Sequence, residues 1–168
     1  MKNGKHLHKL ILCAAFAALT CLATLVIQIP SPLSGFMNLG DALVLTSAVL
    51  LGPVYGTAAA GIGSCLADVL SGYVVYAPAT LVIKSLMALV LCLFLRVIHR
   101  PRFLAGLLGA IAAETVMVLG YFAYDAFFLG FGMGAAVGIP ANLIQAALGI
   151  VITMCLVPIL KKIPYIFD

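Results

Sequence analysis

Charged residues are scarce in this chain. They make up 8% of its 168 residues, whereas a soluble domain typically carries about 25%. Hydrophobic residues make up 65%, and the mean hydropathy is +1.26. So few charges leave little polar surface to face water, and the apolar runs lack the alternation that a membrane β-barrel requires. The composition predicts an all-α polytopic membrane protein with one domain, residues 1–168.

Several catalytic and nucleotide-binding motifs are also absent. No GxxxxGK[ST] sequence occurs, so we do not expect the chain itself to hydrolyse ATP. HExxH and CxxC are missing, and the five cysteines lie in apolar segments, as buried cysteines do. We therefore expect no metal site, no disulfide and no cofactor in this chain.

An intramembrane serine protease is a separate possibility, because Ser64 follows Gly61-Ile62-Gly63. That chemistry requires a base, usually histidine. The three histidines, His6, His8 and His99, are expected on the cytoplasmic side, far from Ser64. We therefore predict that the protein is not an enzyme.

Turn and loop residues divide the chain into six apolar helices. A spanning helix needs about 20 apolar residues, and the N-terminal run is long enough to be a retained helix rather than a cleaved signal. Gly52-Pro53 separates two short helices in the middle. The predicted helices cover approximately residues 7–28, 39–51, 53–70, 78–98, 103–128 and 136–160.

Basic residues predict the orientation in the plasma membrane. Eight of the nine lysines and arginines lie in three places: Lys2, Lys5 and Lys9; Arg96, Arg100 and Arg102; Lys161 and Lys162. With six helices, these three places fall on one side, which the positive-inside rule makes cytoplasmic. We therefore predict N-in and C-in, and interpret the net charge of +4 as an orientation signal rather than a sign of nucleic-acid binding.

The stretch from Asn38 to Lys84 is apolar almost throughout, yet it holds Asp41 and Asp68 as well as Lys84. Ionisable side chains inside a bilayer are costly and usually functional. Asp68 and Lys84 are both expected in the outer third of the membrane, where they either form an ion pair or contact a ligand. Asp41 is expected near the outer surface, where it is either solvated or part of a site.

Polar side chains of the last two helices point to the same outer half. Glu114, Tyr121 and Asp125 follow a helical period on one face, with Glu114 near the midplane. Asn142 and Gln145 share a face of the last helix. Asp125 is either solvated or part of the site, and the two amides either bind a ligand or join helices. Together these residues predict a ligand site open to the outside, with Tyr73 and Tyr76 as membrane-interface anchors.

Four sequence runs resemble a known family: FMNLGDA from Phe36, LGPVYG from Leu51, GIGSCLADVLSGY from Gly61 and APATLVIK from Ala77. They are similar to the substrate-binding S components of energy-coupling factor (ECF) vitamin transporters, in the riboflavin-transporter-type branch that includes proteins assigned to hydroxymethylpyrimidine or vitamin B6 uptake. Asn38 lies in the first run and joins the candidate ligand-binding residues.

The resemblance implies a mechanism and partners. Such a subunit binds a vitamin from outside and then associates with a transmembrane scaffold (T) subunit and two ATPases, which hydrolyse the ATP. An AxxxA pattern on the first helix contacts the scaffold in this family, and Ala14 and Ala18 match it. The segment Ile29 to Phe36 occupies the place of the family's lid over the ligand.

Two questions stay open at this level. A stand-alone transporter coupled to protons through Glu114 or Asp68 is the alternative function. As for the ligand, a carboxylate, amides and tyrosines suit a small neutral or cationic heterocycle. Pyridoxine-type vitamers and hydroxymethylpyrimidine are favoured, and riboflavin, which needs a larger cavity, comes next.

Overall fold

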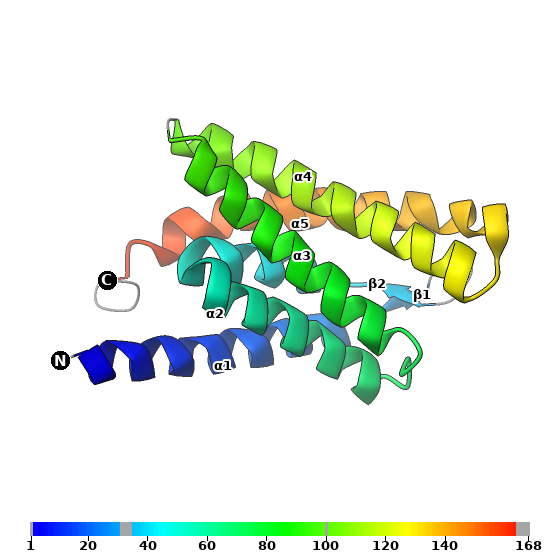
Figure 1. The fold of residues 1–168 in the computed structure, drawn as a ribbon, viewed down its shortest axis with the longest axis horizontal. Coiled ribbons are helices and arrows are strands. Elements are labelled where there is room, and N and C mark those ends of the chain that lie inside the picture. Colours follow the sequence, from blue (N-terminus) through cyan, green and yellow to red (C-terminus); the bar gives the residue numbers. More distant parts are fainter. Residues whose placement is uncertain (1, 31–34, 100, 164–168) are drawn as a thin grey trace.

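A computed structural model describes residues 2–30, 35–99 and 101–163, and most of them are helical (Figure 1). Two strands of two residues each pair antiparallel, with Ile29 opposite Met37. The elements are α1 (Lys2–Val26), β1 (Ile29–Pro30), β2 (Phe36–Met37), α2 (Gly40–Leu70), α3 (Ala77–Val97), α4 (Arg102–Ala123), the π-helical turn η1 (Tyr124–Phe128), the 3-10 helix η2 (Gly132–Gly138) and α5 (Ile139–Leu160). The predicted all-α fold is confirmed.

The outer surface of the helices is apolar. Large hydrophobic side chains on several elements face outward, among them Val26, Val54, Phe127 and Phe128, each at least 72% exposed. Five helical stretches among the described residues are long and apolar enough to cross a membrane. These features match a protein surrounded by lipid, and they confirm the predicted polytopic membrane protein.

Helix α2 is broken at Gly52, as the sequence predicted. Gly52 has φ 77° and ψ −172°, a backbone conformation that is open essentially to glycine alone. The chain turns back there: a Cβ on Gly56 would lie 2.7 Å from Cα of Ala48, and the Ser47 hydroxyl is 3.3 Å from the Gly56 carbonyl oxygen. In a straight helix, residues eight apart are separated by about 12 Å. The two halves of α2 therefore fold against each other.

This reversal brings both ends of α2 to one end of the molecule. Asn38, just before α2, and Asp68, near its end, line the same cavity. Val49, shortly before the break, lines a crevice at the opposite end together with Arg102 and Lys161. The first half, from Gly40 to Leu51, is only about 18 Å long. The two predicted short helices thus exist as the halves of α2, and a count of six full membrane crossings stays a prediction.

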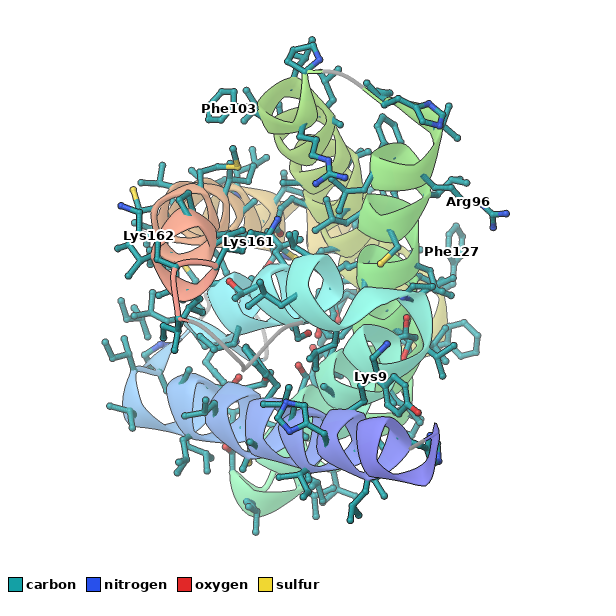
Figure 2. All side chains as sticks on the ribbon, turned by 90° about the vertical axis from the view of Figure 1, so that its left-hand side faces the viewer. Lys9, Arg96, Phe103, Phe127, Lys161 and Lys162 are labelled. Atoms are coloured by element: carbon teal, nitrogen blue, oxygen red, sulfur yellow. The ribbon has the colours of Figure 1, made fainter. Side chains whose placement is uncertain are left out.

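The basic residues gather at one end. The start of α1, the end of α3, the start of α4 and the end of α5 lie at the left of Figure 1. Figure 2 views that end and shows Lys9, Arg96, Lys161 and Lys162 projecting from it. Arg100 lies outside the described residues. The predicted clustering of positive charge on one side is therefore confirmed for the labelled residues.

The larger of two core clusters joins α2, α3, α4 and α5, and the smaller one packs Cys13 and Phe16 of α1 against α2. Helix α2 packs against α1, α3 and α5, and α4 packs against α3 and α5. Val44, Leu45, Met87, Leu91 and Met117, from α2, α3 and α4, are fully buried in the larger cluster. Because these side chains hold α3 and α4 against the first half of α2, they fix the positions of the polar side chains described next.

Candidate functional site

A cavity lies at the end of the bundle opposite the basic residues. It is formed by β2, the end of α2, the α2–α3 loop, the start of α3, the end of α4 with η1, and the start of α5. Its volume is about 50 Å³, which is room for a few water molecules. The lining residues are Gly35, Phe36, Asn38, Asp68, Tyr73, Tyr76, Thr80, Tyr121, Asp125, Gly138, Asn142 and Gln145.

Aromatic rings form one wall of this cavity. The ring centroids of Tyr76 and Tyr121 are 6.4 Å apart, and those of Phe36 and Tyr73 are 5.0 Å apart. The Tyr76 hydroxyl donates to Oδ1 of Asp125 at 2.8 Å. Tyr76 is buried, so its predicted role as a membrane-interface anchor is wrong. Tyr73 is half-buried and lines the cavity, and its role as an interface anchor stays a prediction.

Two carboxylates face the cavity. Asp68 and Asp125 are each 7% exposed, and Oδ2 of Asp68 has no hydrogen-bond partner among the described residues. Lysine and arginine are missing from the lining residues that the structure describes. A buried acceptor without a donor is costly. A ligand that donates hydrogen bonds or carries positive charge would remove that cost.

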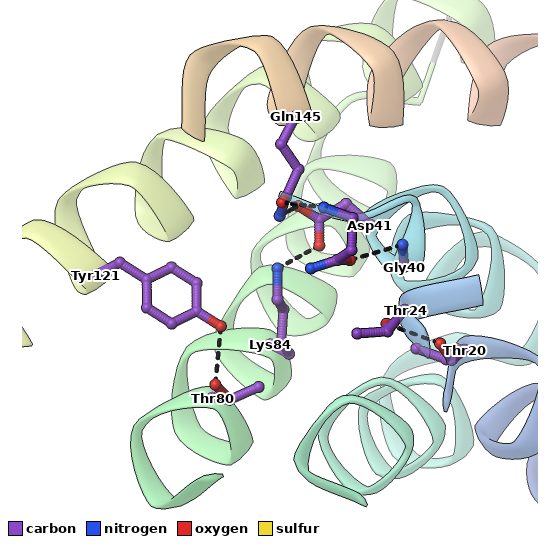
Figure 3. Close-up of polar contacts among 9 residues, drawn as sticks. Thr20, Thr24, Gly40, Asp41, Thr80, Lys84, Tyr121 and Gln145 are labelled. Carbon is purple, nitrogen blue, oxygen red and sulfur yellow. Dashed lines mark hydrogen bonds and ion pairs between the residues drawn. The ribbon is translucent and has the colours of Figure 1, made fainter. Parts of the chain in front are cut away.

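Behind the cavity lies a second polar group, the Asp41 network, which consists of Asn38, Asp41, Lys84 and Gln145 (Figure 3). Asp41 pairs with the Lys84 ammonium through Oδ1 and accepts a hydrogen bond from Nε2 of Gln145 at Oδ2, at 2.6 Å. Oε1 of Gln145 accepts the backbone N–H of Asn38 at 2.8 Å. The network joins α2, α3 and α5 beneath the cavity.

Two expectations about these residues are wrong. Lys84 forms its ion pair with Asp41 and not with Asp68, because the fold of α2 brings Asp41 to it. Asp41 is also fully buried rather than solvated at the outer surface. The same reversal of α2 explains both results, since it carries the start of that helix into the core.

Glu114 lies beside this network but outside the cavity lining. It is 2% exposed, and neither carboxylate oxygen has a hydrogen-bond partner within the described part of the chain. Gly149 makes room for it, since a Cβ there would lie 2.8 Å from Oε1 of Glu114 and 3.0 Å from Cβ of Asp41. Glu114 and Asp41 are therefore two carboxylates close to one ammonium, that of Lys84.

The structure brings together most of the predicted ligand-binding residues. Lys84 and Glu114 do not line the cavity, so direct ligand contact by either one stays a prediction. The predicted residues that line it are Asn38, Asp68, Tyr121, Asp125, Asn142 and Gln145.

Sequence reasoning missed Thr80 and misassigned Tyr76, whereas Phe36 was predicted as part of the lid. Thr80 precedes Lys84 by four residues, so the helical period places both on one face of α3. Its hydroxyl lies 2.9 Å from that of Tyr121, and either can be the donor. The helical period could therefore have identified Thr80, whereas no local pattern distinguishes a tyrosine at a cavity from one at the membrane interface.

The predicted partner and lid segments lie at the surface. Ala14 and Ala18 are exposed on α1, one turn apart, beside the exposed Ile11 and Leu22. Of the predicted lid, β1 and Phe36 are described, and Phe36 lines the cavity. Residues 31–34 of that segment lie outside the described part of the chain.

Comparison with known proteins gives two matches. The model of a family described as ECF-type riboflavin transporter, S component, matches residues 5–162. An uncharacterised protein from Pyrococcus woesei is 39% identical over 142 residues, which cover 84% of this chain and 93% of that protein. The first match covers nearly every helix described above.

Proposed function

This chain belongs to the family of ECF-type riboflavin transporter S components, and from that membership we propose that it captures a small vitamin or vitamin precursor from outside the cell. The cavity lined by Asp68, Asp125 and the tyrosines is the proposed binding site. Uptake would then require a scaffold subunit and two ATPases, with ATP hydrolysed by those partners.

The proposed orientation follows from the charge distribution. The basic end would face the cytoplasm, where positive residues accumulate, with both termini inside and six membrane-crossing segments. The cavity, at the other end, would then open outward, as capture from outside requires. Ala14 and Ala18 would lie on the lipid-exposed face of α1, free to contact the scaffold helices at close backbone distance.

The cavity chemistry favours a small heterocycle with hydrogen-bond donors. The unpartnered Oδ2 of Asp68 is the observation that carries this proposal, because it needs a donor that a ligand in the cavity would supply. Tyr76 and Tyr121 would stack on a flat ring, and Asn142 and Gln145 would bind its polar edge. Any vitamin must displace side chains from a cavity of about 50 Å³. A pyridoxine-type vitamer or hydroxymethylpyrimidine would displace fewer of them than riboflavin.

Isothermal titration of the purified protein with pyridoxine, hydroxymethylpyrimidine and riboflavin tests this proposal. D68N and N142A should each weaken binding of the correct ligand at least tenfold, which is about 1.4 kcal/mol. Q28A is the matched control for N142A, because Gln28 is exposed and bonds to Ser71 outside the cavity. Tight binding of riboflavin would support the proposed vitamin-binding function but reject pyridoxine and hydroxymethylpyrimidine as the ligands. If none of the three compounds binds, both the proposed function and the favoured ligands are rejected.

A proton-coupled transporter working alone is the second candidate, and Glu114 is the observation that favours it. Its buried carboxylate has no described donor, so it could carry a proton. Liposomes that contain only this chain separate the two functions. Vitamin uptake that is driven by a pH gradient and abolished by E114Q would support the proton-coupled transporter. Under the first function we expect no uptake until the scaffold and ATPases are added. The same variant tests the predicted ligand contact of Glu114: vitamin binding weakened at least tenfold in E114Q would support that contact, and unchanged affinity would remove Glu114 from the site.

A further inference from the structure

A second, larger cavity lies at the basic end, outside the site described above. It is a crevice between α3, α4 and α5, with Val49 of α2 at its base, and its volume is about 510 Å³. That volume is within the range of ordinary ligand sites. Its lining residues are Val49, Leu91, Leu95, Arg102, Phe103, Gly106, Thr153, Met154, Val157, Pro158 and Lys161.

The crevice is apolar along its length and positive at its mouth. Arg102 begins α4, and Lys161 follows α5, so both lie where the helices end. Thr153 and Met154 lie about two turns deeper, or roughly 11–12 Å along α5 from Lys161. The Thr153 hydroxyl already donates to the Ala42 carbonyl oxygen at 3.0 Å, so it offers no free donor to a ligand.

No counter-charge for the mouth is present among the described residues. Arg102 and Lys161 are both exposed, and neither forms an ion pair in that part of the chain, where the ion pair found is between Asp41 and Lys84. Aspartate and glutamate are likewise missing from the described lining of the crevice. Its occupant should therefore combine a negative group with an apolar chain.

We propose that this crevice binds an anionic phospholipid, with its phosphate between Arg102 and Lys161 and an acyl chain along Leu91, Leu95 and Met154. The crevice has the same sequence of polar and apolar parts as such a lipid. Its charges lie at the membrane surface, where the head group is, and its apolar walls lie at the depth of the acyl chains. Basic pockets between transmembrane helices bind anionic head groups in this way. A free phosphate ion would leave the apolar length of the crevice unfilled.

Gly106 gives the test its specificity. It lines the crevice, and a Cβ there would have open space within 4 Å. Gly106→Leu therefore places a bulky side chain in the crevice, where it obstructs an acyl chain without touching the charges. It should not unfold the protein, since leucine favours a helix more than glycine does.

The experiment is native mass spectrometry of the full-length, delipidated protein with phosphatidylglycerol or phosphatidylcholine carrying identical acyl chains. Each basic residue near the membrane surface contributes about 1 kcal/mol to binding of an anionic lipid. Two of them predict about a 30-fold preference for phosphatidylglycerol. R102Q/K161Q should abolish this preference, and G106L should prevent binding of the lipid. K162Q is the matched control, because Lys162 neighbours Lys161 but does not line the crevice.

Four results would overturn the proposal. The first is equal binding of the two lipids, and the second is wild-type binding by folded G106L. The third is loss of bound phosphatidylglycerol in 10 mM inorganic phosphate, which would identify an anion site without an acyl-chain site. If G106C, rather than binding lipid, forms cross-links to the scaffold subunit, the crevice is a protein interface instead.

Discussion

The buried ion pair between Asp41 and Lys84 makes a prediction that separates structural from ligand-binding residues. Lys84 is 3% exposed, and Asp41 is fully buried. Removing one partner of a buried pair leaves an uncompensated charge and typically costs 3–5 kcal/mol. In K84M, Gln145 still donates a hydrogen bond to Asp41. We therefore expect K84M to lower the free energy of unfolding by about 3 kcal/mol, the low end of that range.

The double variant D41N/K84M should recover most of that loss. With both charges gone, the asparagine that replaces Asp41 can still accept the Gln145 amide N–H, so neither position of the pair keeps an unpaired charge. Glu114 loses the neighbouring ammonium in K84M and in the double variant alike, so this loss does not distinguish the two variants. Replacing both members of a buried pair is often neutral. We therefore expect a net cost of about 1 kcal/mol and a coupling between the two sites of about 2 kcal/mol or more.

Sodium dodecyl sulfate titration in mixed micelles, followed by far-ultraviolet circular dichroism, measures the free energy of unfolding. D68N is the matched control, since Oδ2 of Asp68 has no described partner to lose. It should leave stability unchanged or raise it, while weakening ligand binding. The reasoning is refuted if K84M costs less than about 1 kcal/mol, or if the double variant is as unstable as K84M.

Three further substitutions test other features. G52A should lower the free energy of unfolding by about 1–3 kcal/mol, because alanine at φ 77° is strained; an unchanged value in the same titration would contradict the fold of α2. G149A places a Cβ 2.8 Å from Oε1 of Glu114 and should lower the free energy of unfolding by about 1–3 kcal/mol. The double variant G149A/E114A removes that clash and should recover much of the lost stability in the same titration. Y76F leaves Oδ1 of Asp125 without its 2.8 Å donor, so it should lower the free energy of unfolding by about 1–3 kcal/mol and weaken ligand binding. Equal melting temperatures and affinities for Y76F and wild type would show that the Tyr76 hydroxyl is not needed as a donor to Asp125.

The sequence predicts those parts of the structure that depend on local pattern. Apolar runs and glycine-proline breaks located the helices, including the break at Gly52, within a few residues. The period of α4 correctly placed Glu114, Tyr121 and Asp125 along one inward side. Basic residues identified one end of the bundle. Each of these follows from the rise and period of a helix, so neighbouring residues are enough.

Pairing between helices could not be predicted in the same way. From the sequence, Asp68 was the partner considered for Lys84, whereas the structure pairs Lys84 with Asp41 at the other end of α2. Because α2 turns back at Gly52, both carboxylates reach the same end of the bundle. Gln145, more than 100 residues away, donates to the second oxygen of Asp41 and so supports this pairing. That information lies in the packing of α5 and not in any local motif.

The choice of partner also determines what the cavity can bind. If Lys84 paired with Asp68, the carboxylate at the cavity would be neutralised and Asp41 would be an uncompensated charge in the core. An unpaired charge costs more free energy in the core than at the cavity. Pairing with Asp41 instead neutralises the deep carboxylate and leaves Asp68 at the cavity with a free oxygen. Asp68 thus joins Asp125 as a carboxylate at the place where a ligand would enter. It follows that a ligand with a cationic or hydrogen-bond-donating ring edge should stabilise this protein more than a purely accepting one of the same size.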